Sequence, residues 1–123
     1  MRARLVVLGA SLCVGLVPLL SAQDAVKADP QHYKVVSEND EVRVLKVHYG
    51  AQEKSVMHSH PDLVAVFLND AKAKFTFSDG KTQITEVKGG DSVYEPAVSH
   101  LPENIGEKDM DIILVELKGK GAK

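Results

Sequence analysis

The sequence contains five histidines, and two of them form the pair His58-Ser59-His60 in a stretch predicted to be extended. Because side chains alternate along a strand, both imidazoles project from one face, about 6.6–7 Å apart. Two imidazole nitrogens can share one metal ion at about 2.0–2.1 Å each. The pair alone does not establish a metal site, since exposed or hydrogen-bonded histidines are common at this spacing.

A third histidine follows in a second stretch, which runs from Gly90-Asp91 through Pro96 to His100 and Asn104. The Gly-Asp pair predicts a turn that starts a strand, and Pro96 predicts the end of that strand. The chain between His60 and His100 is long enough for several strands to return it beside the first pair. A third neutral imidazole there would complete a set of three histidines and leave coordination positions open for water or substrate.

The elements that must position these histidines are short β-strands. Runs of β-branched, aromatic and aliphatic residues are separated by turn signals such as Asp79-Gly80 and Gly89-Gly90. Besides the extended stretch at 58–60, we predict strands at residues 32–36, 41–49, 63–68, 72–77, 82–87, 92–95 and 110–117. This regular spacing predicts an all-β fold, a sandwich or small barrel with a cavity at its centre.

Two of these strands have an informative alternation. Ala73, Phe75 and Phe77 share one face, which predicts a core-facing row. In residues 41–49 the apolar phase changes after Val44, which predicts a bulge or a bend. The side chains expected in the core or along the cavity are Met57, Val64, Val66, Phe75 and Phe77.

Length and composition limit the classes of function. A chain of 123 residues allows one domain, and 44% hydrophobic with 26% charged residues is typical of a folded protein. The net charge is -2, aromatic residues make up 5%, and there is no tryptophan. Neither a basic surface for phosphates nor a stacking platform for bases is therefore expected, and nucleic acid is not a predicted partner.

The N-terminal residues have the pattern of a secretory signal peptide. Arg2 and Arg4 precede an apolar run at 5–20, which is shorter than the roughly 20 residues that span a bilayer. Small residues follow, and we predict cleavage after Ala22 rather than a retained anchor, so the protein is expected in the periplasm or outside the cell. Cleavage also removes Cys13, the only cysteine. The predicted organisation is a signal peptide at 1–22, a polar leader at 23–31, a β-barrel at 32–118 and a flexible tail at 119–123.

The two histidine stretches resemble the two sequence motifs of the cupin superfamily. His58 and His60 match the His-x-His centre of the first motif. Gly90, Pro96, His100 and Asn104 match the second motif, and the resemblance covers roughly residues 41–117. It implies a cupin-type β-barrel, the double-stranded β-helix or jelly roll, as found in small exported single-domain cupins.

The sequence departs from the cupin pattern at several positions. Gln52 stands where the first motif has its opening glycine, and Val98 stands where the second motif has a glycine. The glutamate ligand of the first motif should fall at Val64 or Ala65, so that ligand is absent. What remains is similar to three-His cupins, among them cysteine dioxygenase and acetylacetone-cleaving dioxygenase.

This resemblance implies that His58, His60 and His100 hold a divalent transition metal, with Fe, Zn, Ni, Mn and Cu all open. The catalytic residues are not identified, and no organic cofactor is implied. Arg43 is the only arginine after residue 22, so no anion-holding arginine is evident. Cupins commonly pair, so a homodimer is also implied.

Three functions remain open from the sequence. The first is an exported metal-dependent dioxygenase that acts on a small molecule. The second is a non-catalytic module that binds a metal or a small ligand in the same barrel. The third is a structural barrel whose histidines no longer bind anything.

The remaining polar residues are assigned as follows. His32 and His48 lie outside both motifs and are expected at the surface. Glu95 is either a solvent-facing strand end or a carboxylate near the metal that could act as a general base. Tyr94 either packs on the outer face or lines the cavity. Asp62 is expected in a loop, with hydrogen bonding to an imidazole as the alternative.

Overall fold

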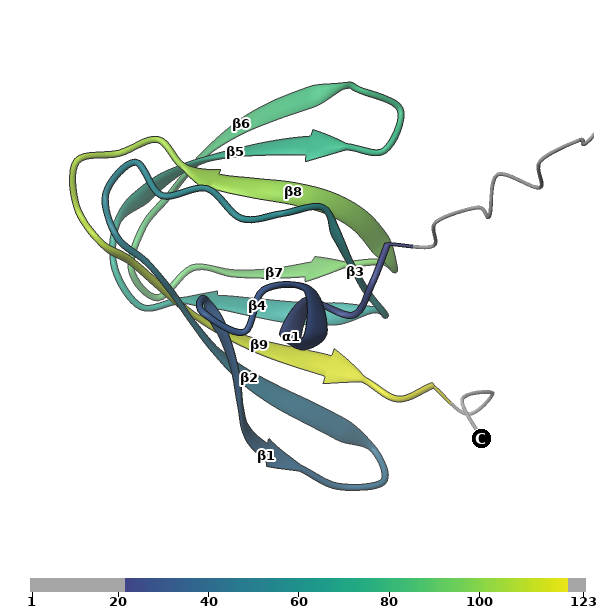
Figure 1. The fold of residues 1–123 in the computed structure, drawn as a ribbon. Coiled ribbons are helices and arrows are strands. Elements are labelled where there is room, and N and C mark those ends of the chain that lie inside the picture. The colour runs from purple at the N-terminus through teal and green to yellow at the C-terminus, as the bar shows by residue number, and fades with distance from the viewer. Residues whose placement is uncertain (1–21, 120–123) are drawn as a thin grey trace, which may run out of the picture.

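A computed structural model describes residues 22–119 of the protein (Figure 1). The predicted signal peptide up to residue 21, Cys13 within it, and the predicted tail after Gly119 lie outside this range. Within it the elements are α1 (Ala25–Ala28), β1 (Tyr33–Glu38), β2 (Val42–Tyr49), β3 (His58–His60), β4 (Leu63–Phe67), β5 (Ala71–Phe77), β6 (Thr82–Val87), β7 (Ser92–Glu95), β8 (Val98–Asn104) and β9 (Met110–Leu117). None of the described residues forms a helix that could cross a membrane.

The nine strands form two antiparallel sheets that face each other, which confirms the all-β prediction (Figure 1). One sheet has the order β1-β2-β9-β4-β7, and the other has the order β3-β8-β5-β6. Neighbours in each sheet come from distant parts of the chain, as in the pairing of β2 with β9 and of β3 with β8. This topology brings the two histidine stretches side by side.

Strand β8 is the one strand of the described residues that the sequence did not predict, and it carries His100. Its inward-facing residues after Val98 are His100, Pro102 and Asn104, which are all buried. A row of polar residues and a proline lacks the apolar alternation that indicates a half-buried strand. Tertiary pairing with β3 and β5 forms the strand instead.

The change of phase predicted for residues 41–49 is accommodated in the neighbouring strand. β2 pairs with β9 without a break, while the β1–β2 register shifts between Val35 and Ser37. Val35 lies opposite Leu45 and Ser37 lies opposite Val44, so the bulge meets the point where the apolar phase of β2 changes. β1 therefore takes the extra residue, and β2 keeps its full pairing with β9.

The core lies between the two sheets and is built by strict alternation. In β9 every second residue is buried, which turns Met110, Ile112 and Leu114 inward together with the charged Glu116. In β4 the buried residues are Leu63, Ala65 and Phe67. The expectation that Val64 and Val66 line the core is therefore wrong, because they occupy the opposite phase and are only half-buried.

The segment expected to be a polar leader is packed against the barrel. Asp24 caps α1 by accepting hydrogen bonds from the backbone N–H groups of Val26 and Lys27. Ala25 is fully buried in the core cluster. The carbonyl of Gln23 also accepts a hydrogen bond from the N–H of Ser59, between the two histidines of β3. This segment therefore belongs to the framework of the histidine pair.

Truncating the core between the sheets should destabilise the protein far more than truncating its surface. Leu45→Ala removes a side chain with 0% exposure and leaves a cavity, so we expect a loss of about 2–5 kcal/mol in the free energy of unfolding. Leu68→Ala is the matched control, because Leu68 is 52% exposed and should change stability by about 0.5 kcal/mol or less. Urea denaturation measures both, and equal losses would contradict this packing.

Candidate metal centre

Strands β3 and β8 bring the three predicted ligands together. In the antiparallel pairing His58 lies directly opposite His100, and His60 lies two residues further along the same face. The three rings are almost mutually perpendicular, with centroids 4.8–5.2 Å apart. One ligand nitrogen of each ring lies within 4.8 Å of the other two, and all three side chains are buried. The site is therefore a buried cluster that could hold a metal ion.

The nitrogen atoms that converge have no partner among the described residues. Nε2 of His58, Nε2 of His60 and both ring nitrogens of His100 are buried without a hydrogen bond. An unsatisfied buried polar group costs about 1–3 kcal/mol, so such groups are rare in native cores. One nitrogen from each ring lies close enough to the other two for a metal ion to be their missing partner.

His60 is oriented by a buried carboxylate that the sequence analysis did not single out. Its Nδ1 lies 2.7 Å from Oε2 of Glu116, whose side chain is only 3% exposed. A carboxylate only accepts, so the imidazole donates from Nδ1 and turns the lone pair of Nε2 towards the cluster. The sequence does contain a signal for Glu116, because the alternation of β9 places it on the inward face with Met110, Ile112 and Leu114.

Arg43 neutralises Glu116 from the other side. Its Nε donates to Oε1 of Glu116 at 2.6 Å, and its terminal nitrogens donate to both carboxylate oxygens of Asp24. Burial alone would raise the pKa of Asp24, but the hydrogen bonds and the charge of Arg43 hold that pKa below its usual value. The only arginine of the described chain is thus committed to this network and does not line the cavity.

His58 is oriented by a second network, which includes His32. Nδ1 of His58 donates to the carbonyl of Val56 at 2.8 Å and lies 3.3 Å from Oγ of Ser55. Ser55 donates to Asp29, and the same Asp29 oxygen lies 2.7 Å from Nδ1 of His32. The expectation that His32 is a surface residue is wrong. It is buried, contacts Glu53 through Nε2 at 3.1 Å and stacks on Tyr49.

His100 is held by packing rather than by a hydrogen bond. Its ring lies against Phe75, with centroids 5.3 Å apart and planes inclined by 28°. Burial lowers its pKa to about 3, with smaller contributions from His60 and His58. Burial also lowers the pKa of His58 to about 4, with a smaller contribution from His60. Both rings are therefore neutral at pH 7, which is the form that binds metals.

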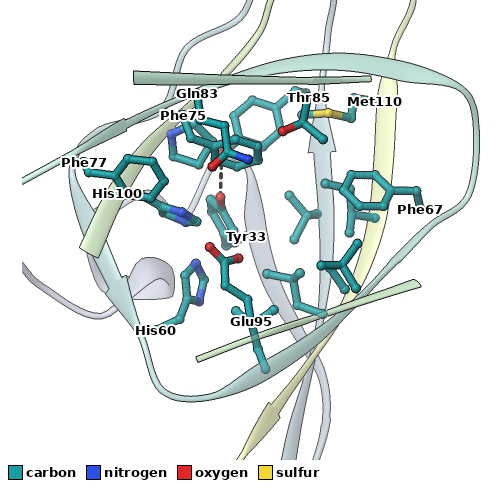
Figure 2. A pocket seen from close by; sticks show the side chains of 18 residues that line it. Tyr33, His60, Phe67, Phe75, Phe77, Gln83, Thr85, Glu95, His100 and Met110 are labelled. Atoms are coloured by element: carbon teal, nitrogen blue, oxygen red, sulfur yellow. Dashed lines mark hydrogen bonds between the residues drawn. The ribbon is translucent and has the colours of Figure 1, made fainter. Parts of the chain in front are cut away.

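A cavity of about 200 Å³ adjoins the cluster. His60 and His100 form part of its wall, and most of the remaining wall is apolar (Figure 2). As predicted, Phe75 and Phe77 line it, whereas Met57 does not. Gln83 and Val93 line the cavity and are exposed, and they lie on the outermost strands β6 and β7, so the cavity opens between these two edges.

Glu95 lies in the wall of this cavity, while its neighbours in the sequence point elsewhere. Figure 2 shows its carboxylate directed into the cavity beside His60 and His100. Burial raises the pKa of Glu95, and the charge of His60 opposes this rise.

Tyr94 is 59% exposed and hydrogen-bonds to Asp62, which also accepts from the N–H of Ala97. Within the part of the chain that the structure describes, Asp62 makes no hydrogen bond to an imidazole.

Two further expectations are confirmed near the site. His48 is exposed and pairs with Asp111 at 2.6 Å. Asn104 is fully buried and fixes the loops at the end of the barrel, since its amide donates to the carbonyls of Tyr49, Gly50 and Lys108. Asn104 is thus structural, because its hydrogen bonds go to the backbone.

The structure resembles solved cupin structures. A cupin domain from Bordetella pertussis superposes with a TM-score of 0.66 at 20% identity, over 71% of this chain and 92% of that one. An RmlC-like cupin family protein with a double-stranded β-helix fold from Methanocaldococcus jannaschii gives a TM-score of 0.58 at 17% identity, over 69% and 77%. An RmlC-like cupin protein from Desulfovibrio desulfuricans gives 0.54 at 18% identity, over 95% and 96%.

No protein-family profile matches the sequence, and no curated protein matches it either. At identities of 17–20% the structural likeness establishes the fold. The chain therefore has the cupin fold, a double-stranded β-helix of two antiparallel sheets, as the two sequence motifs predicted. The three-histidine cluster lies inside that fold.

The buried histidines should make the metal-free protein sensitive to acid. In the folded protein the pKa of His58 is about 4 and that of His100 is about 3. Both lie below the usual 6.5, so as the pH falls the unfolded chain takes up protons before the folded protein does. Stability should fall as the pH drops from about 6.5 towards 3, by several kcal/mol at about 1.4 kcal/mol for each pKa unit. Urea denaturation in the presence of a chelator, at pH values between 7 and 4, measures this dependence.

A variant pair assigns this dependence to the cluster. His100→Phe should flatten the fall in stability, because one of the two shifted groups is removed. His48→Gln should leave the fall in place, since His48 is exposed and its pKa is raised by its hydrogen bond to Asp111. The assignment is wrong if His100→Phe retains the full dependence.

Proposed function

We propose that this protein is a metal-dependent oxygenase of small molecules, with His58, His60 and His100 as the ligands of one divalent transition metal. The observation that carries this proposal is the convergence of buried imidazole nitrogens that have no partner among the described residues. A purely structural core would satisfy or replace such groups. The adjoining cavity provides the space for a substrate.

The donor set suits a redox-active ion or zinc. Three neutral nitrogen ligands leave the full charge of a divalent cation at the site and leave coordination positions free. When bound, an iron ion there supplies activation of dioxygen, and the other candidate metals supply Lewis acidity. Fe, Zn, Ni, Mn and Cu all accept such a set, so the identity of the metal remains open.

The chain's own residues orient the ligands and keep the site dry. Glu116 and the carbonyl of Val56 fix the rings of His60 and His58 from behind, as hydrogen-bonded neighbours of metal ligands do. The apolar wall excludes water and holds a substrate by burial of its apolar surface.

A non-catalytic binding module is the second candidate, and one observation favours it. Where cupins carry the glutamate ligand, this chain has Val64 or Ala65, and Ala65 presents only a methyl group to the cavity. The same three histidines could then hold a metal, or the cavity a small ligand, without turnover. Export through the predicted signal peptide and pairing into a homodimer stay predictions for either function.

Metal binding is tested by elemental analysis of the untagged protein after exposure to zinc. We expect about one zinc ion per chain in the wild type and less than a tenth of that in His100→Ala. His48→Ala is the control, because it removes an exposed histidine outside the cluster and should retain the zinc. Equal zinc contents in His100→Ala and the wild type would refute the site.

Oxygen consumption distinguishes the oxygenase from the binding module. The Fe(II)-loaded protein should consume dioxygen faster than free iron with at least one member of a panel of β-diketones, thiols and phenols. His100→Ala should lose this activity, since it lacks one ligand. If the loaded protein never exceeds free iron across the panel, the oxygenase is wrong and the binding module is favoured.

A further inference from the structure

Glu95 and Glu116 flank the same residue and point to the same side of the sheet. Leu63 of β4 lies opposite Glu95 on one neighbouring strand and opposite Glu116 on the other. Residues that lie directly opposite in an antiparallel sheet share a face. Because Leu63 is buried in the core, both carboxylates are directed into the barrel.

The two carboxylates differ in their partners. Glu116 is saturated, since one of its oxygens contacts His60 and the other accepts from Arg43. Glu95 makes no hydrogen bond or ion pair within residues 22–119, although burial shifts the pKa of its carboxyl. Figure 2 shows it projecting freely into the cavity. Because Glu95 is only half-buried, water can solvate its carboxylate, and a ligand that brings a hydrogen-bond donor into the cavity would take the place of that water.

Glu95 does not belong to the ligand cluster itself. The ligand atoms that lie within 4.8 Å of one another are those of the three histidines alone. Glu95 therefore stands beside the cluster, across space that a molecule in the cavity would occupy (Figure 2).

The cavity also limits the charge and the size of that molecule. Its lining contains no lysine or arginine, and Glu95 is its only acidic side chain. An anion in the cavity would face Glu95 with no lysine or arginine beside it, so only a metal ion held by the histidines could offset the repulsion. A cavity of about 150 Å³ accepts benzene, so about 200 Å³ accepts a ring of that size with one or two substituents.

We propose that Glu95 is a specificity-determining hydrogen-bond acceptor, which selects ligands of about benzene size that carry a hydroxyl donor on an apolar body. The proposal deepens the proposed function and rests on it, because the same cavity would hold the substrate. A carboxyl oxygen accepts in either protonation state, so this selection does not require a particular charge on Glu95.

The experiment measures binding of three matched probes by fluorine NMR titration to the zinc-treated protein. The three probes share a fluorinated benzene ring. 4-Fluorophenol adds a hydroxyl donor, 4-fluorobenzoate adds an anionic carboxylate, and fluorobenzene adds neither. The proteins are the wild type, Glu95→Gln, Glu95→Leu and the control Glu86→Gln. Glu86 is exposed on β6, pairs with Lys72 and does not line the cavity, so its substitution leaves the cavity unchanged.

The wild type and Glu86→Gln should bind 4-fluorophenol about tenfold more tightly than fluorobenzene. In Glu95→Leu this preference should fall to about one, with binding of fluorobenzene retained as evidence that the cavity is intact. In Glu95→Gln the affinity for 4-fluorobenzoate should rise several-fold, because the negative charge is removed, while the affinity for 4-fluorophenol should not rise, because the amide oxygen only replaces one acceptor by another. A side chain that only supports the fold would move both affinities in the same direction.

The proposal is overturned if the preference for 4-fluorophenol is absent in the wild type or survives in Glu95→Leu. It is also overturned if Glu95→Leu loses its zinc, because Glu95 would then be a ligand. Zinc content is measured on every sample, and the probe ratio is measured whether or not zinc is retained. Absence of zinc from the wild type refutes the proposed function, whereas bound zinc with a ratio independent of Glu95 refutes this inference alone.

Discussion

The structure depends on the pairing of β3 with β8, because this pairing places three imidazoles in a core that gives their inner nitrogens no partner. At about 1–3 kcal/mol for each unsatisfied group, the penalty is a large fraction of the roughly 5–15 kcal/mol that stabilises a domain. A sequence selected only for folding would fill these positions with apolar residues. The cluster is present in spite of its penalty, and its geometry could hold a metal ion as the partner of one nitrogen from each ring.

The outer nitrogens show how the rest of the protein supports this cluster. His60 is tied to β2 and to the N-terminal segment through Glu116, Arg43 and Asp24, while His58 is tied to that segment through Ser55 and Asp29. Residues 22–29 therefore meet both networks, and their backbone also bonds to Ser59 between the two histidines. The orientation of the three histidines thus depends on a segment that contributes none of them and that the sequence predicted to be a polar leader.

The sequence predicted whatever depends on local alternation or on fixed spacing. Strands β6, β7 and β9 were predicted with their observed bounds, and the two motifs located all three members of the cluster. Strand β8 was missed because its inward row is His100, Pro102 and Asn104, which reads as a loop. His32 was predicted at the surface because its burial depends on Glu53 and Tyr49, which tertiary contacts bring to it, beside its local contact with Asp29. The alternation of β9 could have identified Glu116 as inward-facing. Its link through Arg43 to Asp24 could not be predicted, because tertiary structure brings these residues together.

The two inward-facing glutamates, Glu95 and Glu116, have different surroundings in the same sheet. Both lie in the row of Leu63, and both are carboxylates near His60. Glu116 is enclosed by Arg43 and His60, so every oxygen is engaged and its position is fixed. Glu95 ends the edge strand β7, where no further strand of the described chain covers it, so its oxygens remain directed into the cavity. Glu116 on the central strand β9 therefore fixes His60, whereas Glu95 on the edge strand β7 is available to accept a hydrogen bond. The cavity opens along that edge, and Glu95 lines it together with His60 and His100.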